Sequence, residues 1–510
     1  MTDPRTLAFA AAVALSVACG GGTKSSAAGQ APTPPTQPAA GPPGPASVQF
    51  GTPGPWPAAN ATYGAKDGLE EPMVVAMTTD EAQDRWVATP RALYLLRPGD
   101  ARFTRFDETA GLHLGDVTGR APGPIGWAKY CDMRPIASDA PCNGQLIWGG
   151  ATGEGIRSLV GGAPGEVFVG YAGAHTDNVV CKDKDDPTGA AGYDYCDPLR
   201  HSGKIDRVKL NADGTIQVTR FDLVLNLTGV KYWHDRYINR LAYDHFVHPG
   251  TLYSGSEHGV TLLFPDRWRA PRPDEWFDLA YSEYMGDHLH AQVCRNADGT
   301  PCRGEEAGQR IGDWLGLAID DQGRLWHAGK WTAGRITWTS DPHTWVDRNG
   351  AAFDAAFGDP YVPGGAGTPP VFEVASEGHE PRLTGVAWCK DGTTWFTTKG
   401  PEDGPSAARG DAVAVWDGKA FAYFTGPAVG IPESRVRDVA CLPDGRLVFA
   451  GFTTGLSVFD PAARASTPIR AQGGLIPSDN VQSIEVDRMV DPPTLHVATD
   501  AGAAALRQLP

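Results

Sequence analysis

The stretch LGLAIDDQGRLWHAG (residues 315–329) holds the pattern that decides the fold. An apolar run, LGLAID, leads into the turn DDQG, and the phrase RLWHAG follows with aromatic and apolar residues before small ones. Apolar and aromatic runs on both sides of a Gly-marked turn are typical of two antiparallel strands. The stretch therefore predicts a β-hairpin.

The second half of this hairpin recurs along the chain. Its seven copies are RWVAT from Arg85, EVFVG from Glu166, TLYSG from Thr251, RLWHAG from Arg324, TTWFTT from Thr393, RLVFAG from Arg446 and TLHVAT from Thr494. Most copies follow a turn rich in Gly, Asp or Pro, and a second Gly-marked turn and a further apolar run come after them. A fourth run often ends in an aromatic residue, as in FTRF and FAYF. Each unit therefore predicts four antiparallel strands, A to D.

Seven four-stranded units wrapped around one axis predict an all-β chain folded as a seven-bladed β-propeller. The alternative is two unrelated all-β domains. The last unit stops after strand C, at GAAALRQLP, and residues 61–69, ATYGAKDGL, have the pattern of a D strand. We expect this N-terminal piece to complete the last blade, which removes an open sheet edge.

The repeated phrases, such as RLVFAG followed by GLSVF, resemble those of bacterial regulator-type and WD-like propeller repeats. The resemblance extends over most of the chain, although each unit matches weakly. It implies the propeller fold and says nothing about activity, since one fold can carry many functions.

The first residues have the features of a targeting segment. The apolar run LAFAAAVALSVA (residues 7–18) follows Arg5 and is too short to span a bilayer. LSVAC resembles a bacterial lipoprotein signal, which implies cleavage after residue 18 and a lipid on Cys19; Ser16 departs from the usual aliphatic residue. We expect a cell-envelope protein, lipid-anchored in the periplasm or on the surface, with plain secretion as the alternative.

Residues 19–47 read as a disordered tether of Gly, Ala, Ser and Pro, because such a segment has too little apolar surface to fold. Residues 48–510 then form a single propeller domain. The net charge of −16 gives no basic footprint for nucleic acid and no attraction to anionic lipids. Contact with the membrane is therefore expected only through the lipid.

Nine cysteines fit an oxidising compartment. With Cys19 lipidated, eight remain, and proximity suggests the pairs Cys131–Cys142, Cys181–Cys196 and Cys294–Cys302. Cys389 and Cys441 are left; they pair if the fold brings them together and are otherwise buried thiols.

Strand direction sorts the loops, because D-to-A and B-to-C connections emerge at one end of a blade and the A-to-B and C-to-D turns at the other. The long insertions are expected at the first end, over blades 1 to 4, and include MGDHLHAQVC (residues 285–294) in the connection from blade 3 to blade 4. Long loops on a rigid scaffold commonly carry binding or catalysis. We call this end the loop face.

Imidazole and carboxylate side chains gather on the predicted loop face and suit a transition metal. The candidate ligands are His175, Asp177, His234, Asp235, His258, Asp287, His288 and His290. The alternative is that these groups only hydrogen-bond neighbouring loops, because no stringent metal motif is present. The acidic loop DKDDPTGAAGYDYCD suits calcium or is a solvated turn.

Aromatic residues near the same loops offer another kind of site. Trp233, Trp314, Trp331 and His379 are candidates for a ligand-binding face toward a protein or carbohydrate, or for ordinary packing between blades. Hydrolase, haem and phosphate-loop motifs are missing from the sequence.

These observations favour an envelope-anchored binding or scaffold module that uses the disulfide-braced loop face. One alternative is a metal-dependent enzyme of hydrolase or lyase type with a His/Asp site on that face. A second is a sensor or assembly component of an envelope complex.

Overall fold

The computed structural model describes residues 54–112, 114, 155–171, 204–222, 224–227, 230–234, 238–256, 260–267, 285–289, 291–292, 309–310, 314–329, 333–336, 383–398, 410–419 and 421–510. The chain divides into two units, and all the described residues belong to the second, Ser47–Pro510. No helix among them is long and apolar enough to cross a membrane.

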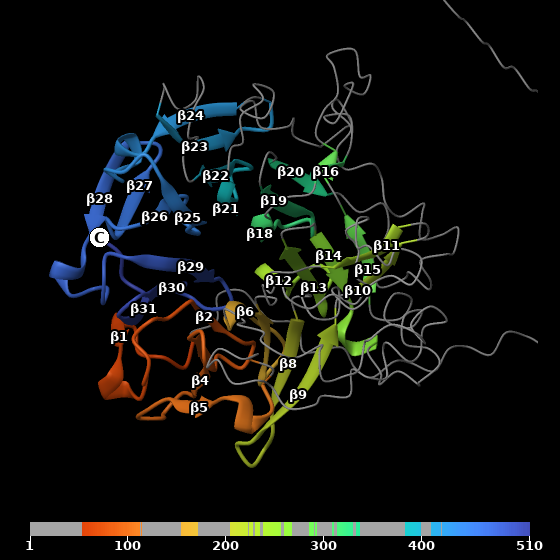
Figure 1. Cartoon of the computed structure of the whole chain (residues 1–510). Helices are drawn as coiled ribbons and strands as arrows, with labels where there is room; N and C mark the ends of the chain where they lie inside the picture. Colours follow the sequence, from red (N-terminus) through yellow and green to blue (C-terminus); the bar gives the residue numbers. More distant parts are fainter. Residues whose placement is uncertain are drawn as a thin grey trace, which may run out of the picture. The chain divides into compact units, whose positions relative to one another are not determined.

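Seven antiparallel sheets form a ring of blades, as predicted (Figure 1). Blade 1 consists of β2 (Ala76–Thr79), β3 (Arg85–Ala88), β4 (Leu93–Leu96) and β5 (Thr104–Phe106). Blade 2 consists of β6 (Ile156–Gly161), β7 (Glu166–Tyr171), β8 (Lys204–Leu210) and β9 (Ile216–Asp222). Blade 3 consists of β12 (Ile238–Asp244), β13 (Thr251–Ser256), β14 (Val260–Leu263) and β15 (Met285–Leu289).

The remaining blades follow in chain order. Blade 4 is described over β18 (Trp314–Ile319), β19 (Leu325–Gly329) and β20 (Ala333–Ile336). Blade 5 is β21 (Leu383–Trp388), β22 (Thr394–Thr398), β23 (Asp411–Trp416) and β24 (Phe421–Thr425). Blade 6 is β25 (Val436–Cys441), β26 (Leu447–Gly451), β27 (Leu456–Asp460) and β28 (Ala465–Ile469). Blade 7 is β29 (Val481–Asp487), β30 (Thr494–Thr499), β31 (Gly502–Leu506) and β1 (Ala61–Tyr63).

The ring closes as the sequence predicts. The first strands of successive blades contact one another in the order β2, β6, β12, β18, β21, β25 and β29, and β29 contacts β2 again. β1 pairs antiparallel with β31, with Ala61 opposite Ala505 and Tyr63 opposite Ala503. The N-terminal strand therefore completes the last blade and covers the edge of β31.

The seven repeated phrases are the second strands, β3, β7, β13, β19, β22, β26 and β30. These strands are buried on both faces because each lies between two neighbouring blades. In β3, Trp86 packs in a cluster shared with blade 2, while Val87 packs in a cluster shared with blade 7. The hydrophobic core therefore lies between the blades.

Buried aspartates organise the turns that follow four of the first strands. The Asp320 carboxylate accepts the main-chain N–H groups of Gln322 and Arg324 and the indole N–H of Trp326, the last at 3.0 Å. Asp80 makes the corresponding bonds in blade 1, including one from the indole of Trp86. Asp244 and Asp487 also accept main-chain N–H groups just beyond their strands.

Short 3-10 turns follow four outer strands: η1 (Ala65–Asp67), η2 (Glu108–Ala110), η8 (Pro427–Val429) and η9 (Ala471–Gly473). Each ends at a glycine with positive φ, for example 98° at Gly68 and 100° at Gly111. Glycine takes this left-handed conformation without a Cβ clash, which lets the chain turn toward the next first strand.

Two predictions about the loops were wrong. Residues 285–289 form β15, the outer strand of blade 3, with His288 opposite Thr261; they do not lie in the connection to blade 4. The chain also leaves β14 through η4 (Pro265–Arg267), at the end opposite the loop face, so the insertion between β14 and β15 does not begin on that face. Successive strands of a blade do alternate in direction. The apolar runs in the sequence, however, did not show which segment forms the fourth strand of blade 3.

Two hairpins precede first strands, and so belong to the loop face. β10 (Val224–Leu227) pairs with β11 (Val230–His234) ahead of β12, and β16 (Ala291–Gln292) pairs with β17 (Gln309–Arg310) ahead of β18. They show that the D-to-A connections into blades 3 and 4 carry secondary structure of their own.

Candidate functional site

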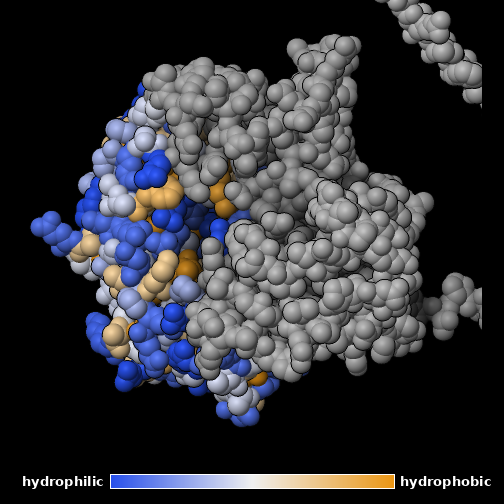
Figure 2. Space-filling model, viewed as in Figure 1, coloured by the Kyte–Doolittle hydropathy of each residue, from blue (hydrophilic) through white to orange (hydrophobic). Residues whose placement is uncertain are grey.

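A cavity of about 970 Å³ lies at the centre of the ring, lined mainly by the first strands of all seven blades. Ligand pockets commonly enclose roughly 300–1,000 Å³, so this space would hold a small molecule or a short extended segment. In Figure 2, the coloured part of the outer surface is mostly hydrophilic with scattered apolar patches, and strongly apolar and hydrophilic residues lie together toward the middle of the view.

β-bulges shape the end of the cavity at the loop face. The first strands of blades 2 to 7 each carry an irregularity after their first residue, for instance between Ile156 and Ser158. The extra residues are Arg157, Asn239, Leu315, Thr384, Arg437 and Gln482, and all six line the cavity. Bulges re-aim side chains and are common beside functional sites. Here they place one side chain per blade at the same level.

Two of these bulge residues are arginines that contact an amide on the next blade. Arg157 Nε donates to Asn239 Oδ1 at 2.8 Å, and Arg437 Nη1 donates to Gln482 Oε1 at 3.4 Å. The Arg437 guanidinium also lies 4.2 Å from the centre of the Phe452 ring. Burial lowers the pKa of Arg437, while the charges of Asp438 and Glu433 act to raise it.

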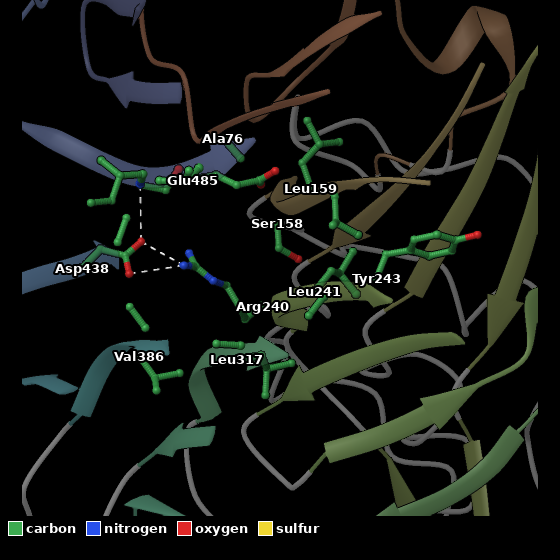
Figure 3. Close-up of a pocket in the computed structure, with 18 of the residues that line it drawn as sticks. Ala76, Ser158, Leu159, Arg240, Leu241, Tyr243, Leu317, Val386, Asp438 and Glu485 are labelled. Carbon is green, nitrogen blue, oxygen red and sulfur yellow. Dashed lines mark hydrogen bonds and ion pairs between the residues drawn. The ribbon is translucent and has the colours of Figure 1, made fainter. Parts of the chain in front are cut away.

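An ion pair crosses the middle of the cavity from blade 3 to blade 6 (Figure 3). Arg240 Nη2 lies 3.0 Å from Asp438 Oδ2 and 3.2 Å from Oδ1. The Asp438 side chain is 3% exposed and also accepts the main-chain N–H groups of Val439 and Ile484. The Arg240 side chain is 23% exposed, and this exposure is to the cavity that it lines.

Glu485 lies on the cavity wall near this pair (Figure 3). It accepts a hydrogen bond of 2.7 Å from the Thr78 hydroxyl on blade 1. Burial raises the pKa of Glu485 to about 7, the Thr78 hydroxyl and the charge of Arg240 act against the rise, and Asp487 and Asp438 add to it. Near neutral pH this carboxyl is therefore able to accept a proton from a ligand or to donate one to it.

Hydroxyl groups fasten the blades around the cavity. Ser158 donates to the carbonyl of Ile238 at 2.8 Å, Thr384 to that of Val436 at 2.6 Å, and Ser483 to that of Val75 at 2.9 Å. Each bond joins one blade to the next. The wall that carries Arg240, Asp438 and Glu485 is thus braced by polar bonds as well as by apolar packing.

The last two cysteines form a disulfide. Cys389 and Cys441 are bonded, with their Cα atoms 5.6 Å apart. Cys441 ends β25 and Cys389 directly follows β21, so the bond joins blades 5 and 6 beside the cavity, at the end opposite the loop face.

The charges of the lining differ from those of the chain as a whole. The described lining residues include Arg157, Arg240, Lys390, Arg437 and Arg488, against Asp244, Asp320, Asp321, Asp438 and Glu485. The whole chain has 44 Lys and Arg against 60 Asp and Glu. The described lining is therefore balanced in charge and lacks the acidic excess of the chain, which suits a ligand that carries both charges.

The predicted site residues that the structure describes do not line this cavity. Trp233 and His234 lie in β11, Asp287 and His288 in β15, and Trp314 begins β18. The other candidates fall outside the described residues: His175, Asp177, Asp235, His258, His290, Trp331, His379, Cys19, Cys131, Cys142, Cys181, Cys196, Cys294 and Cys302. Within the described ranges, no group of three or more His, Cys, Asp and Glu is placed to hold a metal ion.

Sequence reasoning missed Arg240, Asp438 and Glu485 because it searched the loops. A signal was present in the first strands INRLAYD, VRDVAC and VQSIEV, where a charged residue interrupts an apolar run. A charged residue in a strand that faces the axis of a ring is costly to bury without a partner. Such positions are therefore candidates for pairing or for ligand contact.

No protein-family model matches the chain, and no curated protein sequence matches it. Among solved structures, it is similar to a chain of the mitotic checkpoint complex, with a TM-score of 0.42 and 10% identity over 88% of this chain and 94% of that one. It is also similar to the extracellular domain assigned to a hybrid two component system from B. thetaiotaomicron, with a TM-score of 0.33 and 12% identity over 85% of this chain and 56% of that one. At these values neither structure bears on what the chain binds, and the observed strands alone identify it as a seven-bladed β-propeller.

Proposed function

We propose that the protein is a binding module that holds a small polar ligand in its central cavity. The observation that carries the proposal is the Arg240–Asp438 pair in a cavity of about 970 Å³. Both contacts to Asp438 come from Nη2 of Arg240. Among the described residues no other partner of the Arg240 guanidinium is found, so its other N–H groups can donate to acceptors of a ligand, such as carboxylate oxygens.

Glu485 gives the same region an acceptor or a donor, depending on its protonation. A ligand with both acceptor and donor groups would therefore satisfy Arg240 and Glu485 together. Ligands of this kind include amino acids, short peptides, dicarboxylates and acidic sugars.

The loop face provides the route to the cavity in this proposal. The hairpins β10–β11 and β16–β17 belong to that face, as do the bulge residues. We propose further that disulfides within the insertions brace this face over blades 1 to 4, where it contacts a protein or carbohydrate partner. The lipid on Cys19 would hold the module in the cell envelope, and fractionation of cells that carry Cys19→Ala tests this placement.

A defined ligand panel tests the proposed function. Amino acids, tripeptides, dicarboxylates and uronic acids are screened by thermal shift and native mass spectrometry against the wild type and against Arg240→Met/Asp438→Asn. A ligand that binds only the folded state stabilises it by RT ln(1 + [L]/Kd) and so raises the melting temperature as its concentration exceeds Kd. We expect a panel compound that binds the wild type and loses at least about tenfold in affinity in the double variant, equivalent to roughly 1.4 kcal/mol.

Arg102→Gln is the matched control, because Arg102 is exposed and lies away from the cavity lining. This variant should bind the same compound as the wild type does. Equal binding by the wild type and the double variant would show that the ligand lies elsewhere, for example on the loop face.

A further inference from the structure

Arg488 lies at the end of the cavity opposite the loop face. It follows β29 directly and lines the cavity with Trp388 and Lys390 of blade 5. Its Nη2 donates to the main-chain carbonyls of Trp388 at 3.1 Å and Cys441 at 3.2 Å. A side chain of blade 7 is thus fixed by the backbones of blades 5 and 6, on both sides of the Cys389–Cys441 disulfide.

No carboxylate among the described residues forms an ion pair with Arg488. In the part of the chain that the structure describes, Arg240, Arg207 and Arg324 each form an ion pair with a carboxylate, whereas Arg488 forms none. Burial lowers the pKa of Arg488, and no neighbouring charge acts against that effect. Carbonyl dipoles hold the guanidinium in place without neutralising it.

We propose that Arg488 is a subsite for an oxyanion, either a carboxylate or a phosphate, at one end of the ligand. The carbonyls of Trp388 and Cys441 accept from Nη2, which leaves the N–H groups of Nε and Nη1 as separate donors to an oxyanion. Lys390 also lines this end of the cavity.

The position of this subsite also constrains the length of the ligand. Glu485 and Arg488 are three residues apart along β29 and its continuation, which corresponds to about 10 Å between their Cα atoms at the rise of a strand. A ligand that reached from Arg488 to Glu485 would therefore have to span a distance of that order. This inference rests on the proposed function, because it assigns two ends to the ligand of the same cavity.

The oxyanion subsite is tested with inorganic phosphate and with acetate, each titrated at constant ionic strength against chloride. Thermal shift and isothermal titration are recorded for the wild type, Arg488→Gln, Arg488→Lys and Arg102→Gln. We expect saturable binding to the wild type and to Arg102→Gln, a loss of at least about tenfold in Arg488→Gln and an intermediate affinity in Arg488→Lys. The ratio of the phosphate and acetate affinities then identifies the preferred anion.

Equal affinity of the wild type and Arg488→Gln for phosphate and for acetate would overturn the subsite, as would the absence of saturable binding to the wild type. Crystals of the wild type soaked in selenate give a second test that needs no variant. An anomalous peak within hydrogen-bond distance of Arg488 supports the subsite, and its absence there contradicts it.

The same variants separate this inference from the proposed function. Phosphate binding that needs Arg488, together with a panel in which no compound depends on Arg240 and Asp438, would uphold the subsite and reject the proposed function. A compound that depends on Arg240 and Asp438 but binds Arg488→Gln normally would uphold the proposed function and reject the subsite.

Discussion

Arg240 and Asp438 show how one pair of side chains joins opposite parts of the ring. Asp438 is almost fully buried, and Arg240 is its only cationic partner among the described residues. Removing one member of a buried pair leaves the other charge uncompensated, which costs more than the pair itself contributes.

We therefore expect Arg240→Met to lower the free energy of unfolding by about 2–4 kcal/mol, because Asp438 would keep its burial without its cation. Arg240→Met/Asp438→Asn should recover most of this loss, since both charges are gone. Urea denaturation of the wild type, both single variants and the double variant measures the coupling. A double variant no more stable than Arg240→Met would show that the pair is not the cause.

The raised pKa of Glu485 predicts that the free energy of unfolding depends on pH. Its pKa in the folded protein, about 7, is above its ordinary value of 4.5. The folded state therefore holds a proton that the unfolded chain releases between those pH values. The stability that Glu485 contributes is fully present below pH 4.5 and is lost as the pH rises through 7.

Glu485→Gln carries no titrating proton at this position. It should remove a fall of at most about 3 kcal/mol in unfolding free energy between roughly pH 5 and 7.5, and less where water in the cavity screens the charge. Glu70→Gln is the control, because the Glu70 side chain is 70% exposed. The two variants are compared by denaturation at several pH values, and identical pH profiles for Glu485→Gln and the wild type would contradict the assignment.

Among the elements, the turns after the first strands depend on single aspartates. Asp320 accepts two main-chain N–H groups, the guanidinium of Arg324 and the indole of Trp326. Its neighbour Asp321 is exposed and makes none of these contacts. Of these two adjacent aspartates, Asp320 thus stabilises the turn, whereas Asp321 lies on the surface.

Asp320→Ala is expected to cost about 2–4 kcal/mol, because it leaves buried donors unpaired. Asp321→Ala should change stability by less than about 0.5 kcal/mol, as a substitution of an exposed residue does. Thermal denaturation of the two variants compares them directly. A loss of equal size in both would show that the turn does not depend on the carboxylate of Asp320.

The ring as a whole is stabilised by a disulfide between two blades and by the pairing of β1 with β31. The Cys389–Cys441 disulfide spans 52 residues of sequence and joins blades 5 and 6. A cross-link of this length restricts the unfolded chain and is worth about 3–4 kcal/mol in the chain-entropy estimate.

Cys389→Ser/Cys441→Ser should therefore lower the unfolding free energy by about that amount without opening the ring, because the cores between the blades persist. Peptide mapping without reduction checks the bond in the wild type, and denaturant titration measures the loss. Recovery of both cysteines as free thiols in the oxidised wild type would contradict the pairing.

At the other closure, β1 covers the edge of β31, and Arg85 lies 3.7 Å from the centre of the Trp56 ring while donating to the Tyr63 hydroxyl. Deletion of residues 1–64 removes the strand and these contacts; deletion of residues 1–53 leaves them intact. We expect only the longer deletion to lower the melting temperature and to promote aggregation through the exposed edge. Light scattering during heating distinguishes the two, and equal behaviour would show that β1 is not needed for closure.

Most of the fold was predictable because its signals are local. Each second strand repeats an aromatic phrase between Gly-marked turns, and the missing last strand was visible in the ends of the chain. The fourth strand of blade 3 was not recognised, because MGDHL has neither the alternation nor the aromatic ending of the other outer strands. Its pairing with β14 depends on a partner that is distant in sequence.

The sequence by itself determined the number of blades, their strand order and the closure between the termini, since these follow from patterns of burial and turns that repeat along the chain. Only the tertiary structure decided the site. Arg240 and Asp438 are 198 positions apart, and Cys389 and Cys441 stand in different repeats. Charged and thiol side chains interact over a few ångströms, so their partners are set by which strands the ring brings to its axis.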